Sequence, residues 1–153
     1  PLQGDSTSQF NDLKMSVKYT DMDNNSIDVS ALNQGSTFKA EVTIINPGLR
    51  GYYEEMALTQ MFPSGWEIIN TRFEGTESAY ENSPFDYQDI RDDKVLTYFD
   101  INRNGTHKYT VLLNASYAGK FYLPTISCSA MYDNTINASL PGSWIIVKSK
   151  NFE

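Results

Sequence analysis

A strict alternation of apolar and polar residues is the feature that most constrains how this chain folds. Between positions 13 and 20, the apolar residues Leu13, Met15, Val17 and Tyr19 alternate with Lys14, Ser16, Lys18 and Thr20. Successive side chains of a β-strand point to opposite faces, so this pattern predicts a strand with one face buried and one in water. The same parity recurs at Phe38, Ala40, Val42 and Ile44. The alternation therefore predicts a β-sheet protein.

Turn residues divide the chain into about eight short strands, which is typical of a sandwich. A turn at Asp21–Ser26 precedes a short strand predicted around Ile27–Val29, and a second turn follows at Asn33–Gly35. The next strands end at Asn46–Gly48 and Phe62–Gly65, because Pro lacks the ladder N–H and Gly adopts turn conformations. We predict an all-β fold, an antiparallel two-sheet β-sandwich.

The clearest local prediction is a β-hairpin centred on Asn104-Gly105. Asn-Gly between two alternating runs is a strong hairpin signal, because both residues tolerate positive φ. The first run is Val95–Ile101, and the returning strand carries Tyr109, Val111, Leu113, Ala115 and Tyr117.

The chain length and one acidic segment set the domain organisation. The length of 153 residues suits one domain, since a single core commonly serves ~100–200 residues. We expect residues 1–12 to be a linker or edge segment and residues 13–153 to form a single sandwich domain. The acidic segment 70–93 lacks a sustained period and leaves room for one short helix or for a solvated loop.

The charge and the termini limit the classes of partner. The net charge of −7 and the pI near 4.6 disfavour nucleic acid and anionic membranes, which need a field of Lys and Arg. No stretch approaches the ~20 apolar residues of a membrane span, so no transmembrane segment is predicted. The chain begins at Pro1 without a visible signal peptide, and we expect a fragment of a larger protein whose targeting signal lies upstream.

The sequence contains few residues of the types that commonly act as catalytic bases or nucleophiles, with one histidine and one cysteine. His107 is the only histidine and stands beside the predicted hairpin turn, where a solvated loop residue is expected. Cys128 is the only cysteine, so no internal disulfide can form, and its strand parity predicts a buried, inert thiol. We predict no catalytic residue and no enzyme activity.

A metal site is also weakly supported. The spacing of Asp21, Asp23 and Asn25 is similar to that of a calcium loop, but Ser26 and Leu32 stand where Gly and a bidentate Glu are required. The carboxylates of the acidic segment could supply oxygen ligands, although a solvated charged loop is the simpler interpretation. We predict no metal ligands and no cofactor.

Aromatic residues leave one alternative function open. The sequence places Tyr52, Tyr53, Tyr80 and Tyr87 in loops or at strand ends, where rings can stack on sugars or proteins. A stand-alone extracellular adhesive or carbohydrate-binding module is therefore the second hypothesis.

Three segments, in this order, resemble signatures of one family. They are Leu58–Ile68, with Pro63, Gly65 and Trp66; Asp89–Val95, with Arg91, Asp92 and Asp93; and Tyr117–Pro124, with Gly119 and Pro124, followed by Met131-Tyr132. Between residues 13 and 147 the chain resembles the last macroglobulin-like domain of bacterial alpha-2-macroglobulins, which has a receptor-binding-like fold. The eight residues named within the three segments are expected to be structural.

The resemblance implies a role in protease inhibition. In this family, a thioester built from Cys-x-Glu-Gln lies in a separate domain and traps proteases that cleave a bait region. The last domain packs on the thioester, and a Met-Tyr pair shields it, which here implies Met131 and Tyr132. The implied partners are the thioester domain of the same polypeptide and, through the full-length protein, target proteases. The implied location is the periplasm or cell envelope, with a lipid anchor at an upstream N-terminus.

Strand parity supports part of this picture independently. Ile126, Cys128 and Ala130 share one parity and are expected to face the core. Met131 should therefore point away from the core, where a flexible thioether next to a tyrosine suits contact with a partner.

Overall fold

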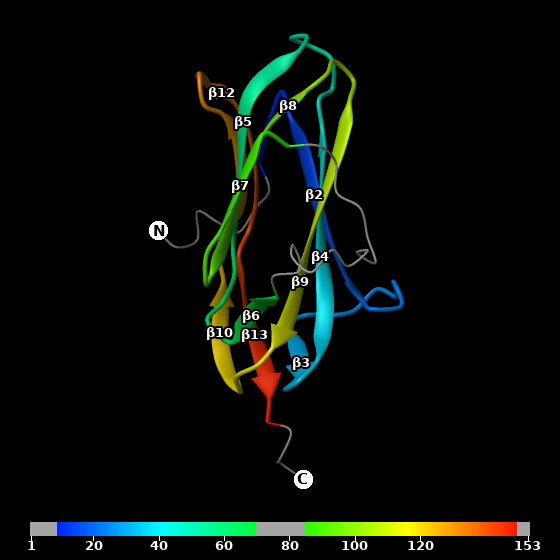
Figure 1. The fold of residues 1–153 in the computed structure, drawn as a ribbon, viewed down its shortest axis with the longest axis vertical. Helices are drawn as coiled ribbons and strands as arrows, with labels where there is room; N and C mark the ends of the chain where they lie inside the picture. Colours follow the sequence, from blue (N-terminus) through cyan, green and yellow to red (C-terminus); the bar gives the residue numbers. More distant parts are fainter. Residues whose placement is uncertain (1–8, 70–84, 150–153) are drawn as a thin grey trace.

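The computed structural model describes residues 9–69 and 85–149, and within them all regular structure is β-strand. Figure 1 shows two sheets facing each other, with a smaller third sheet at the lower end. The six-stranded sheet has the order β1 (Gln9–Asn11), β12 (Asp133–Leu140), β11 (Ile126–Ala130), β5 (Tyr53–Met61), β8 (Lys94–Ile101) and β7 (Tyr87–Ile90). The four-stranded sheet has the order β2 (Lys14–Asp21), β4 (Thr37–Ile45), β9 (Thr106–Ala115) and β6 (Trp66–Ile69).

The third sheet refines the predicted two-sheet architecture. It has the order β10 (Gly119–Leu123), β13 (Ser143–Lys148) and β3 (Ala31–Asn33). β13 and β3 run parallel, whereas the other strand pairs of the described residues are antiparallel. The all-β sandwich is confirmed, with three hydrogen-bonded sheets in place of two.

The predicted hairpin around Asn104-Gly105 is wrong. β8 pairs with β5 and β7, whereas β9 pairs with β4 and β6, so the turn joins two different sheets. The connection spans residues 102–105, and the Gly105 N–H donates to the Asn102 carbonyl at 2.8 Å. Only Asn104 has a positive φ, of 61°, whereas the type I′ hairpin turn needs positive φ at both central residues.

Two further local predictions need correction. Residues Ile27–Val29 form no strand: Ser26 makes an isolated bridge to Thr20, and Ile27 and Val29 pack from the side against the core. The strand instead begins at Ala31, because Leu32 is the residue that reaches the interior and pairs with Val147. In the acidic segment, residues 85–93 contain β7 where a helix was considered, and residues 70–84 lie outside the described residues.

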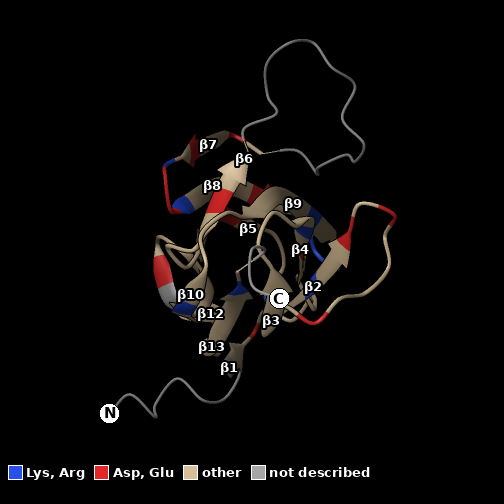
Figure 2. Cartoon of the chain, turned by 90° about the horizontal axis from the view of Figure 1, so that it is seen from below, with Lys and Arg blue, Asp and Glu red and all other residues tan. Residues whose placement is uncertain are grey.

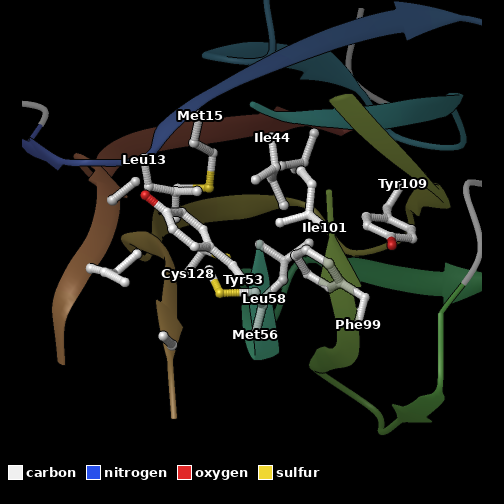
Figure 3. Packing of buried hydrophobic residues seen from close by; sticks show 14 of the residues in the cluster. Leu13, Met15, Ile44, Tyr53, Met56, Leu58, Phe99, Ile101, Tyr109 and Cys128 are labelled. Atoms are coloured by element: carbon white, nitrogen blue, oxygen red, sulfur yellow. The ribbon is translucent and has the colours of Figure 1, made fainter. Parts of the chain in front are cut away.

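The interior between the sheets consists of two hydrophobic clusters. The first surrounds Tyr53, Met56 and Phe99 and contains Cys128 (Figure 3). The second surrounds Trp66, whose ring contacts Phe38 edge-on at a centroid distance of 4.9 Å. Full burial of one large apolar side chain contributes ~1.5–3 kcal/mol, so these clusters hold the three sheets together.

Candidate functional site: the Met131–Tyr132 turn

Met131 and Tyr132 form the short turn between β11 and β12, at the upper end of the molecule in Figure 1. The preceding strand buries Ile126, Cys128 and Ala130, each at most 3% exposed. Met131 is 61% exposed and Tyr132 is 56% exposed. The outward direction predicted for Met131 from strand parity is therefore confirmed.

The backbone of this turn is fixed to β5. The Met131 N–H donates to the Glu55 carbonyl at 2.9 Å. Glu55 lies in a β-bulge, where Glu54 and Glu55 together oppose Asp100, and its φ is 53°. The Asp100 carboxylate accepts the Glu55 N–H at 2.9 Å and the Tyr52 hydroxyl at 3.0 Å. The bulge therefore gives the Met131–Tyr132 turn its carbonyl partner.

Arg50 ties the turn to the start of the domain. Its guanidinium lies 2.9 Å from Asp12 and 2.9 Å from Asp133, and it donates to the Thr135 hydroxyl at 3.2 Å. Hydrogen bonds from the Thr135 hydroxyl and N–H, with the charge of Arg50 as a further cause, lower the pKa of Asp133. One guanidinium thus links Asp12, in the connection between β1 and β2, with the first residue of β12.

The candidate aromatic residues differ in exposure. Tyr53 is fully buried and donates its hydroxyl to the Asp12 carbonyl at 2.6 Å, so its predicted surface role is wrong. Tyr52 is 50% exposed, and Tyr87 is 60% exposed and stacks on Tyr98. Tyr80 lies outside the described residues. Tyr52 is thus the exposed candidate aromatic that joins the hydrogen-bond network of the Met131–Tyr132 turn.

His107 is the second residue of β9 and is half-buried, so the prediction of a solvated loop residue is wrong. Its ring stacks in parallel on Tyr109, with the Tyr109 hydroxyl 3.3 Å from Nδ1. Burial lowers the pKa of His107, and a hydrogen bond to the Asp100 carbonyl partly offsets this. These partners are a phenol and a carbonyl, which hold the ring without making it a base for a nucleophile.

Cys128 and the turn at Asp21 also show structural roles. Burial raises the pKa of the Cys128 thiol, which keeps it in the unreactive protonated form. The Asp21 carboxylate accepts the N–H groups of Asp23 and Asn25 at 2.9 and 3.0 Å. The Lys39 ammonium donates to the Asn24 side chain at 2.5 Å. The oxygens of this turn therefore serve hydrogen bonds, and within the described residues no cluster of acids, His and Cys is arranged for a metal ion.

The residues predicted to be structural gather at the opposite, lower end. A groove of about 540 Å³ is lined by Trp66, Arg91, Asp92 and Asp93 among others, and Figure 2 looks at this end of the molecule. The Phe62 N–H donates to the Asp93 carbonyl at 2.8 Å, which joins two of the resembling segments.

Two glycines at this lower end leave space for one aromatic ring. A Cβ on Gly65 would lie 2.3 Å from the Phe121 ring, and one on Gly119 would lie 2.9 Å from the same ring. Pro63 accepts the Trp66 N–H at 3.0 Å, and Pro124 directly follows the end of β10. The two resembling segments around these glycines are thus packed against each other.

The network around the Met131–Tyr132 turn was missed at the sequence level. Its members, which come from separate parts of the chain, are Asp12, Arg50, Tyr52, Glu55, Asp100, Asp133 and Thr135. Period-two patterns show which residues face the core, but they carry no information on which exposed ions meet. The positive φ of Glu55 could not be predicted either, because glutamate is not a residue type that favours this conformation.

Comparisons with known proteins agree with this architecture. The structure of Salmonella alpha-2-macroglobulin reacted with methylamine matches with a TM-score of 0.79 at 17% identity, over 92% of this chain and 9% of that chain. Native alpha-2-macroglobulin from Escherichia coli, from domain MG7 to the C-terminus, matches with a TM-score of 0.80 at 15% identity, over 92% of this chain and 24% of that chain. These similarities define a macroglobulin-like β-sandwich.

The family follows from the sequence. Residues 13–134 match the model of the bacterial alpha-2-macroglobulin MG10 domain. The chain belongs to this family. A search among curated proteins finds no match. In the part of the chain that the structure describes, no helix has the length and apolar character to cross a membrane.

Proposed function

We propose that this chain is the non-catalytic C-terminal interaction domain of a bacterial alpha-2-macroglobulin-like protease inhibitor. In this role it packs on a neighbouring domain of the same polypeptide and shields the thioester of that domain. The observation that carries the proposal is the exposed Met131–Tyr132 turn, which is held in place by Glu55 and Arg50. Two exposed apolar side chains on a fixed backbone suit a contact surface better than a solvated loop.

The physics of shielding fits these two side chains. An activated acyl bond is hydrolysed by water, so a cover that excludes water protects it. Met adapts its shape to an irregular surface, and Tyr combines an apolar ring with a polar tip. Because the turn is already ordered by hydrogen bonds, less entropy is lost when it docks.

The proposal includes partners and a location. The chain spans 9% of the Salmonella protein and 24% of the Escherichia coli fragment, so the reaction with a protease would belong to the full-length protein. We propose target proteases as its partners, and the periplasm or cell envelope, with a lipid anchor upstream of this chain, as its location.

The test is the variant Met131→Ala/Tyr132→Ala in the full-length protein. We expect its spontaneous reaction with methylamine to be about tenfold faster, because losing ~1.4 kcal/mol of covering contact raises the uncovered population tenfold. The loss of thioester over time, measured by mass spectrometry, gives the rate.

The matched control is Tyr122→Ala/Trp144→Ala, which removes two exposed side chains from the lower end. This variant should keep the wild-type rate. A wild-type rate in the Met131→Ala/Tyr132→Ala protein would refute the shielding role.

A further inference from the structure

A shallow pocket of about 310 Å³ opens directly beside the Met131–Tyr132 turn. It is lined by Tyr52, Glu54, Glu55 and Tyr132. Binding pockets for small molecules commonly measure ~300–1,000 Å³, and this volume lies at the lower end of that range, where one long side chain of a partner fits. All four lining residues are exposed at the surface.

The β-bulge explains how two carboxylates reach one pocket. Neighbouring residues of a regular strand point to opposite faces. In β5 the burial order is buried Tyr53, exposed Glu54, exposed Glu55 and buried Met56. The bulge thus turns both glutamates toward solvent, beside the two tyrosine rings.

Glu54 and Glu55 lack a salt-bridge partner in the part of the domain that the structure describes. The nearby cation, Arg50, is bound to Asp12 and Asp133. Asp100, Glu54 and Asp86 also act on Tyr52, whose pKa they raise, the hydrogen bond to Asp100 first. The pocket therefore has a negative potential that is open to solvent.

The aromatic rings add a second attraction for a cation. The face of a tyrosine ring carries negative charge density and attracts ammonium or guanidinium groups. The Tyr52 hydroxyl donates to the Asp100 carboxylate at 3.0 Å, which holds this ring, and the Met131 N–H holds the backbone next to Tyr132. Two rings and two carboxylates around one opening form a site for a single cationic side chain.

We propose that this pocket receives a lysine or arginine side chain of the neighbouring domain, and that this contact sets the position of the Met131–Tyr132 turn on its partner. The inference rests on the proposed function. In the open pocket the charges are solvated and bind a cation weakly. Docking removes water from the site, and the attraction then becomes stronger.

The test uses hydrogen exchange of the full-length protein. In Glu54→Gln/Glu55→Gln, which keeps the side-chain size and the backbone contacts, we expect amides of residues 50–56 and 129–136 to exchange about tenfold faster than in the wild type. High salt should have the same effect on the wild type. The control, Asp23→Asn, removes an exposed carboxylate from the turn that follows β2 and should leave this exchange unchanged.

If Glu54→Gln/Glu55→Gln exchanges as slowly as the wild type, the proposal that this pocket binds a cationic side chain is refuted. The same substitution in this chain expressed alone is a second check. If it also speeds exchange there, the charge loss acts on the fold of the domain and not on docking, and the proposed pocket contact is wrong. Hydrogen exchange reads docking and not the thioester, so the two proposals separate. If exchange stays slow in Glu54→Gln/Glu55→Gln while Met131→Ala/Tyr132→Ala reacts faster with methylamine, the pocket proposal fails and the shielding role stands. If exchange is faster in the glutamine variant while Met131→Ala/Tyr132→Ala keeps the wild-type methylamine rate, the shielding role fails and the pocket proposal stands.

Discussion

The two ends of the sandwich differ in how they place large side chains: the lower end buries them, and the upper end exposes them. At the lower end Trp66 is 3% exposed, and Gly65 leaves the space that the Phe121 ring occupies. At the upper end Met131 is 61% exposed and rests on hydrogen bonds and ion pairs. The lower end is held by packing, and the upper end is held by polar contacts that leave its apolar groups free for contact.

This difference indicates what each end is for. Tight packing is sensitive to small changes in volume, so substitutions at the lower end should change stability. Exposed ion pairs contribute little to stability, so substitutions at the upper end should change local order and docking. We expect the buried residues of the resembling segments at the lower end, such as Trp66, to support the scaffold that carries the Met131–Tyr132 turn.

The largest expected effect is on the tryptophan of the lower core. Trp66→Ala should lower the free energy of unfolding by ~3–5 kcal/mol, because it removes a buried ring and leaves a cavity. Urea unfolding monitored by circular dichroism measures this difference. The matched substitution Trp144→Ala removes a ring that is 59% exposed and should cost at most ~1 kcal/mol. Equal losses in the two variants would contradict the description of the lower end as the packed end.

A smaller effect is expected from one added methyl group. Gly65→Ala places a Cβ 2.3 Å from the Phe121 ring, and overpacking of this kind costs ~1–3 kcal/mol. If the ring is the cause, Gly65→Ala/Phe121→Leu should lose less stability than the sum of the two single variants. Additive losses in this double-mutant cycle would show that the glycine is needed for its backbone and not for its space.

The sequence predicts the packed parts of the molecule better than the polar ones. The alternation at Leu13, Met15, Val17 and Tyr19 correctly locates β2, because burial of every second residue is a local, periodic property. Parity also predicts the outward direction of Met131, and the exposure agrees, although Met131 itself lies in the turn just after β11 ends. The Asn104-Gly105 hairpin fails, because the turn type depends on φ at both residues and on what each strand packs against.

The surroundings of the Met131–Tyr132 turn follow from tertiary geometry alone. Arg50 meets Asp12 and Asp133, which are 38 and 83 positions away in the sequence. An exposed arginine and an exposed aspartate are ordinary surface residues, and no spacing rule brings them together. The all-β sandwich and the outward Met131 could thus be predicted from the sequence, whereas the third sheet and the network that holds the turn required the structure.

The smallest effect on stability, and the sharpest contrast with the lower end, is expected for Arg50→Met. This variant removes the guanidinium that joins Asp12 and Asp133 but keeps an apolar side chain of similar length. The midpoint of thermal unfolding should change little, because the Arg50 side chain is exposed and both carboxylates are partly exposed to solvent. Amides of residues 131–136 should nevertheless exchange about three- to tenfold faster, since local opening depends on local contacts. The matched control is Arg103→Met, on an exposed arginine of the turn between β8 and β9, which should leave this exchange unchanged. A large fall in thermal stability without a change in exchange would mean that Arg50 supports the scaffold, and the contrast between the two ends would then be wrong.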